Sequence, residues 1–167
     1  MKEFLQGRRL GYALRPSIGH IAFGLGAAAM LLDLMAWFAW GSSRTNGFVV
    51  GAYWLVVAVA LVSLVAGLTA VAELRDVPPD ERGLARLDVI AILAAAALYV
   101  LSAALRTADQ GAAGASPAAL LSAAAGLIVL AVGGVLGSSL YAAREWEVVD
   151  EDEFEPRRHH PRRSRAG

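Results

Sequence analysis

The chain has 167 residues, of which 57% are hydrophobic and 18% are charged. Soluble domains usually carry about 25% charged residues, so this composition favours a membrane protein. The formal net charge is zero, so nothing in the bulk charge predicts a nucleic-acid partner. The chain has no cysteine, which excludes disulfides, thiolate metal sites and a thiol nucleophile.

Four long apolar runs follow one another, at about residues 18–40, 48–72, 89–105 and 118–142. A helix crosses a hydrocarbon core about 30 Å thick with about 20 residues, within a range of about 17 to 25. All four runs fit that range. The first is longer than the apolar part of a signal peptide, about 7 to 15 residues, so we expect it to be retained. The sequence therefore predicts an all-α, integral membrane four-helix bundle with four transmembrane spans over residues 18–142.

The basic residues predict the orientation of these spans. Thirteen of the 15 Lys and Arg residues lie in the N-terminal segment 1–17, in the central loop 73–88 or in the C-terminal tail. Only Arg44 and Arg106 lie elsewhere. Cytoplasmic loops carry the excess of Lys and Arg, so both termini and the central loop are expected in the cytoplasm. An even number of spans agrees with this N-in/C-in topology.

Small residues predict how the helices pack. Lipid tails are as apolar as leucine, so helices associate in a bilayer through close backbone approach at small residues. Pairs of such residues four apart are expected to pack helices within one chain: Ser63 with Gly67, Gly133 with Gly137, and Gly134 with Ser138. A homo-oligomer built on the same faces is the alternative.

Asp33 places a carboxylate inside the first run. Insertion scales assign about 2.5 to 3.5 kcal/mol to a charged side chain at the centre of a spanning helix, so a compensating partner is expected. Arg106, at the outer end of the third run, can reach this level, and Arg44 is the second candidate. We interpret Asp33 as part of a structural clasp, with Arg106 or with a Ser or Thr, that fixes helix register. The alternative is a proton-carrying carboxylate, because ionisable residues inside spans often mark proton paths.

His20 begins the same run and is the one candidate for binding a cofactor. It lies 13 residues before Asp33, which is about 20 Å along a helix, so the two cannot share a small site. A haem ligand at His20 would need a partner, and the four runs hold no second histidine. A histidine at the membrane interface is therefore favoured over a haem site, and no cofactor or metal is predicted.

The C-terminal tail changes composition abruptly. Seven acidic residues between Glu145 and Glu155 are followed by the basic block Arg157–Arg165. Few apolar residues and dense charge predict a disordered cytoplasmic tail over residues 143–167. Its basic end would suit anionic lipid or a protein partner.

Several short motifs together resemble a known family. They are Pro16 just before the first run, His20, Gly24 and Asp33 within it, Gly67 and Glu73 around the end of the second, and VGGVLGSSLYAAREWEV at the end of the fourth. Over about residues 14–149 the chain resembles the bacterial membrane-protein family called domain of unknown function 2231. Arg15 and Asp88 stand where that family has histidines.

The resemblance implies a four-span protein of the bacterial inner membrane. Relatives are sometimes joined to Rieske-type or other redox domains, which implies a place near electron-transfer chains. Because two family histidines are replaced here, the resemblance gives His20 no partner for a cofactor.

No nucleophile–base pair, phosphate loop or metal cluster occurs in the sequence, so an enzyme is not expected. The predicted function is a non-catalytic structural or redox-chain-associated membrane component, with the lipid bilayer and other membrane or redox proteins as partners. Two alternatives stay open: a small transporter or proton-conducting module using Asp33, and a haem or quinone redox protein centred on His20.

Overall fold

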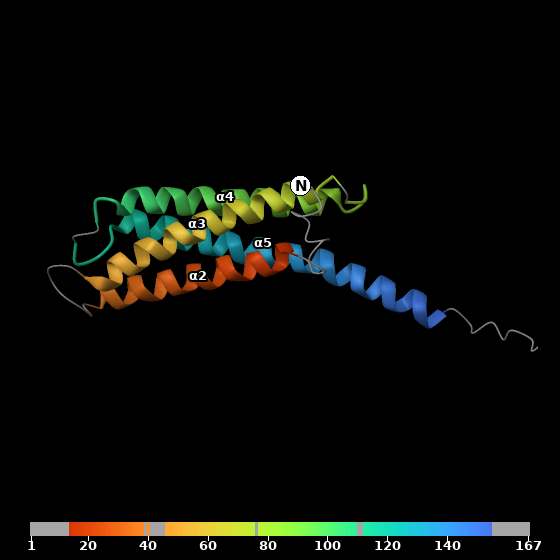
Figure 1. Cartoon of the computed structure of the whole chain (residues 1–167), viewed down its shortest axis with the longest axis horizontal. Helices are drawn as coiled ribbons and strands as arrows, with labels where there is room; N and C mark the ends of the chain where they lie inside the picture. The colour runs from red at the N-terminus through yellow and green to blue at the C-terminus, as the bar shows by residue number, and fades with distance from the viewer. Residues whose placement is uncertain (1–13, 39, 41–45, 76, 110–111, 155–167) are drawn as a thin grey trace, which may run out of the picture.

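The computed structural model describes residues 14–38, 40, 46–75, 77–109 and 112–154, with only the helical backbone for residues 14–17 and 140–154. This part of the chain forms four α-helices and no strand: α2 (Leu14–Trp37), α3 (Gly47–Glu73), α4 (Arg82–Arg106) and α5 (Pro117–Phe154). Consecutive helices run antiparallel and lie side by side in a bundle (Figure 1). The predicted all-α four-helix bundle is confirmed. We call the end with the α2–α3 and α4–α5 connections the distal end, and the end with the α3–α4 connection the proximal end.

Each helix is long and apolar enough to cross a membrane, over Ile18–Trp37, Gly47–Glu73, Arg82–Arg106 and Pro117–Ser139. The outward faces carry large apolar side chains that are 61 to 71% exposed, among them Leu31, Trp54, Leu68, Ile90 and Leu121. Soluble monomers rarely expose contiguous apolar patches larger than a few hundred Å². The outer surface therefore suits contact with lipid.

The core is built mainly from small residues at heptad spacing. Each helix buries one row of residues separated alternately by three and four positions, which keeps a single face toward the neighbouring helices. These core rows are Ala22, Gly26, Ala29, Asp33 and Ala36 in α2; Val49, Ala52, Val56, Val59, Ser63, Ala66 and Ala70 in α3; Ala85, Asp88, Ile92, Ala95, Tyr99, Ser102 and Arg106 in α4; and Ala119, Ala123, Gly126, Leu130 and Gly133 in α5.

Three of the predicted packing residues are buried between helices: Ser63, Gly67 and Gly133. A Cβ added at Gly67 would lie 2.7 Å from Leu93 Cδ2, and one at Gly133 would lie 3.2 Å from the Cβ of Ala91. Both glycines therefore permit close approach to α4. This is the role that small residues play between membrane helices.

The other three predicted packing residues contribute less within the chain. Gly134 and Ser138 are exposed, and nothing lies within 4 Å of the place that a Cβ would take at Gly134. Gly137 is half-buried. The reason is helical geometry, because Gly133 and Gly134 lie about 100° apart around the helix and only one can face α4.

The third helix begins earlier than its apolar run. It starts at Arg82, so the proximal loop is shorter than the predicted 73–88, and Asp88 lies inside α4 rather than in the loop. Pro78 and Pro79 are the last strong helix breakers before it. Arg82 and Arg86 are exposed, so their charges do not oppose the burial of the opposite face of α4.

The last helix continues past its apolar run. α5 extends to Phe154, so residues 143–154 are helical where the composition predicts disorder, and this part projects beyond the bundle (Figure 1). The sequence has no Gly or Pro between Gly137 and Pro156 that would end the helix. The rest of the predicted tail, residues 155–167, lies outside the described residues, as do residues 1–13 and Arg44.

Candidate functional site

Asp33 of α2 and Arg106 of α4 meet in the interior of the distal end. Arg106 Nη1 donates to Asp33 Oδ1 at 2.7 Å, and Nη2 donates to Oδ2 at 2.6 Å. The two side chains are 1% and 0% exposed. The structure thus brings together the two residues that the sequence proposes as a clasp. A bidentate guanidinium–carboxylate pair is among the strongest and most directional hydrogen-bonded arrangements in proteins.

Ser102 extends this clasp to a third helix. It lies one turn before Arg106 on α4, where its Oγ accepts from Arg106 Nε at 3.1 Å. The same hydroxyl donates to the carbonyl of Ala119 in α5 at 2.8 Å. Because Asp33, Ser102, Arg106 and Ala119 all belong to core rows, the heptad spacing itself aligns them. The network joins α2, α4 and α5.

Asn46 closes the distal end by joining its two connections. Its Nδ2 donates to the carbonyls of Trp40, at 3.1 Å, and Ala113, at 3.0 Å. Its Oδ1 accepts from the backbone N–H of Phe48 at 3.0 Å, so the same side chain caps α3. It is only 2% exposed. The Asn-Gly pair reads in the sequence as a simple turn, but Asn is also a strong helix cap, and that signal was available.

The clasp is better suited to holding helices than to moving protons. Both carboxylate oxygens of Asp33 already accept charge-assisted hydrogen bonds from Arg106, which ties the carboxylate firmly to α4. Removing one partner of a buried ion pair leaves an uncompensated charge and typically costs about 3 to 5 kcal/mol. The geometry therefore resists opening.

Two further hydroxyls lie in the core rows. Among the residues that the structure describes, Ser63 Oγ and Tyr99 Oη are buried without a hydrogen-bond partner. The Tyr99 ring fills the space left by two glycines: a Cβ at Gly126 would lie 2.9 Å from Tyr99 Cε2, and one at Gly26 would collide with Tyr99 Oη. Sequence reasoning missed Tyr99, although its spacing of three from Ser102 and seven from Arg106 was the available signal.

Asp88 and His20 stand apart from the clasp. Asp88 is 1% exposed in the α4 core row, and its Oδ1 would lie 3.8 Å from a Cβ at Gly133. The sequence prediction placed it at the edge of a solvated loop and so missed its burial. His20 is exposed near the start of the first span, two residues before the buried Ala22 and therefore on the outer side of α2. The structure does not bring it near Asp33.

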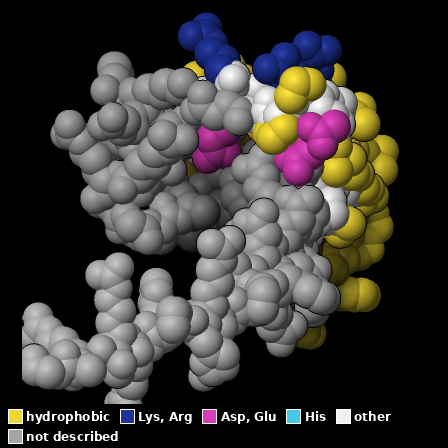
Figure 2. Space-filling view, turned by 90° about the vertical axis from the view of Figure 1, so that its right-hand side faces the viewer, with side chains coloured by type: hydrophobic (Ala, Val, Ile, Leu, Met, Phe, Trp, Pro, Cys, Tyr) yellow, Lys and Arg dark blue, Asp and Glu magenta, His cyan; other side chains and the backbone are white. Residues whose placement is uncertain are grey.

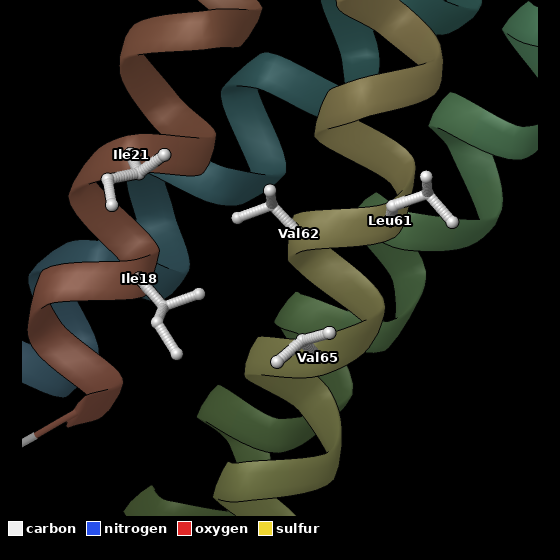
Figure 3. Close-up of a pocket in the computed structure, with 5 residues that line it drawn as sticks. All are labelled: Ile18, Ile21, Leu61, Val62 and Val65. Carbon is white, nitrogen blue, oxygen red and sulfur yellow. The ribbon is translucent and has the colours of Figure 1, made fainter.

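Nothing else in the described part of the chain presents reactive groups together. No group of three or more His, Cys, Asp or Glu residues that could hold a metal occurs there. A hollow of about 280 Å³ opens between α2 and α3. Its lining is wholly aliphatic: Ile18, Ile21, Leu61, Val62 and Val65 (Figure 3). Such a lining can hold an apolar chain but offers no chemistry.

Comparison of the chain with family models, curated proteins and solved structures finds no match. The function has to be inferred from the clasp and the bundle themselves.

Proposed function

We propose that this chain is a non-catalytic structural component of a membrane, whose helices are fixed by the Asp33–Arg106 clasp. The observation that carries the proposal is the bidentate, fully buried ion pair joined through Ser102 to α5. Such a network specifies which helix faces meet, a role documented for some buried polar groups. A rigid four-span unit of this kind suits a partner of other membrane proteins, including redox-chain components.

The clasp can be tested by comparing stability with proton flux. We expect Asp33→Asn and Arg106→Gln each to lower the free energy of unfolding in mixed micelles by about 3 to 5 kcal/mol, because each leaves a buried group uncompensated. The double variant Asp33→Leu/Arg106→Met should lose less than either single variant, since no buried charge remains. Asp80→Asn, at an exposed acid in the proximal loop, is the control and should change nothing.

Flux measurements on the same variants decide between structural and transport roles. Liposomes containing the wild-type protein should conduct no more protons than empty liposomes. Proton flux that Asp33→Asn abolishes without a loss of stability would overturn the structural proposal.

A second candidate function is proton conduction. The α4 core row carries Asp88, Tyr99, Ser102 and Arg106 along one side of the helix. The hydroxyls of Tyr99 and of Ser63 on α3 are buried without a hydrogen-bond partner. Buried polar groups inside spans are candidates for such paths. If this function holds, Tyr99→Phe, which removes only the hydroxyl, should reduce flux in liposomes; unchanged or absent flux would reject it.

We also propose a place for the protein in the cell. The distribution of basic residues supports both termini in the cytoplasm. The motifs around Pro16, His20 and Asp33 support kinship with the four-span bacterial family named above, and hence a bacterial plasma membrane.

A further inference from the structure

We propose that the proximal end of α4 binds an anionic phospholipid, with its phosphate held by Arg82 and Arg86 and an acyl chain lying along the apolar face above them. The inference goes beyond the structural role proposed for the clasp, which lies at the other end of the bundle. It depends only on the helices spanning a bilayer.

One exposed stripe of α4 has the two-part chemistry of such a lipid. Its members are separated by three or four residues, so they share one side of the helix. We define this α4 outer stripe as Arg82, Arg86, Ile90, Leu93, Ala97 and Leu101, all of them exposed. Ile90, Leu93 and Leu101 are 61%, 41% and 49% exposed. The stripe is therefore cationic for its first turn and wholly apolar beyond it.

The arginines are placed to bind a phosphate. Arg82 Nε donates to the carbonyl of Val77 at 3.1 Å, which holds the guanidinium group against the loop and leaves its terminal nitrogens as donors. No ion pair to Arg82 or Arg86 is found among the described residues. Figure 2 views this end of the bundle: basic side chains project from one edge, and acidic side chains are visible on the same face below them. Guanidinium groups are well matched to phosphate oxygens.

The axial distances suit a lipid rather than a free anion. Ile90 follows Arg86 by four residues, about 6 Å along the helix axis, so a phosphate at the arginines would place the glycerol close to Ile90. The exposed Leu93, Ala97 and Leu101 continue along the next turns, at the depth of acyl chains. Phosphate and chain would thus be bound by the same side of one helix.

Native mass spectrometry of the full chain in mild detergent tests this site. Phosphatidylglycerol and phosphatidylcholine are titrated in parallel, and bound lipid is counted. We expect wild type to prefer phosphatidylglycerol, and Arg82→Gln and Arg86→Gln each to weaken that binding about fivefold. Arg75→Gln removes an exposed charge outside the stripe and should have little effect.

Three results would overturn the proposal. Equal retention of the two lipids would show that charge does not select the ligand. An equal loss in Arg75→Gln would show a diffuse surface field rather than a site. Displacement of the lipid by the same concentration of inorganic phosphate would show an anion site with no contribution from the chain. Helix content by circular dichroism checks that each variant is folded. Ile90→Ser, at a side chain of the stripe that is 61% exposed, supplies a second variant that should also weaken binding.

Discussion

At the scale of single residues, the fit between Tyr99 and two glycines shows how this core is filled. The neighbouring core rows hold mostly alanine and glycine, so one aromatic ring occupies space contributed by three helices. A Cβ added at Gly126 would lie 2.9 to 3.3 Å from three carbons of the Tyr99 ring. A ring enclosed in this way has little room to move.

We therefore expect Gly126→Ala to destabilise the bundle by about 1 to 3 kcal/mol through overpacking. Gly134→Ala is the matched control, because it changes the same helix at a position with nothing within 4 Å. There the gain in helix propensity, up to about 1 kcal/mol, should leave stability equal or higher. Thermal unfolding in detergent measures both. Equal losses would mean that the Tyr99 contact is not what makes glycine necessary at residue 126.

Much of the residue-level prediction depended on charge being scarce in the spans. Asp33 stands out because almost everything around it is apolar, and few basic residues lie close enough to pair with it. The burial of Asp88 was not predicted, because this residue follows a loop rich in charged residues and does not stand out among them. Only the position of the α3–α4 turn, after Pro79, decides that it is buried. The role of a serine is harder still to predict from sequence, because whether the Ser102 hydroxyl joins two helices depends on which backbone carbonyl faces it.

At the scale of elements, the heptad core rows explain both what the sequence predicts and what it conceals. The four apolar runs were found from composition, because every face of a spanning helix is apolar. The same uniformity hides which face is inside: the core rows consist mainly of small residues, and many large apolar side chains are exposed. A search for Ala and Gly at intervals of three and four would have found the rows of α2 and α5. It would have missed the α4 row, and with it Tyr99 and Arg106, because only three of the seven residues of that row are small.

The distal connections depend on Asn46, whose two roles can be separated by mutation. Asn46→Ser keeps a cap for Phe48 N–H but has no amide to reach Trp40 and Ala113. Asn46→Ala loses both functions. We expect the free energies of unfolding of the two variants to differ by about 1 kcal/mol, the usual contribution of a cap. The free energy of unfolding of Asn46→Ser should lie below that of the wild type because two hydrogen bonds are lost, at about 0.5 to 1.5 kcal/mol each.

Chemical unfolding in mixed micelles measures these differences, and limited proteolysis shows whether the distal connections open. A serine variant as stable as wild type would mean that the bonds to the two carbonyls contribute nothing. In that case Asn46 would be only a cap.

At the scale of the whole molecule, the arrangement of charge predicts how the bundle lies in the bilayer. The proximal segment, residues 73–88, contains three Arg together with five acidic residues, and the distal connections contain few charged residues. The two loop ends must lie on opposite sides if all four helices cross, because each helix is about as long as the bilayer is thick. The chain has no cysteine, so a single introduced thiol is the only one that a maleimide can label.

We expect Asp80→Cys to react with a membrane-impermeant maleimide only after the cells are permeabilised, and Ala113→Cys to react in intact spheroplasts. Both positions are exposed, and Ala113 uses only its backbone carbonyl to bind Asn46. Leu121→Cys, at a side chain that is 71% exposed on the outward face of α5, should stay unlabelled in both conditions because lipid covers it. Labelling of Leu121→Cys would show that water reaches this face, so α5 would not span the bilayer. Labelling of Asp80→Cys from outside would show that the predicted orientation is wrong. It would not contradict the bundle, because the core rows do not depend on which loop faces the cytoplasm.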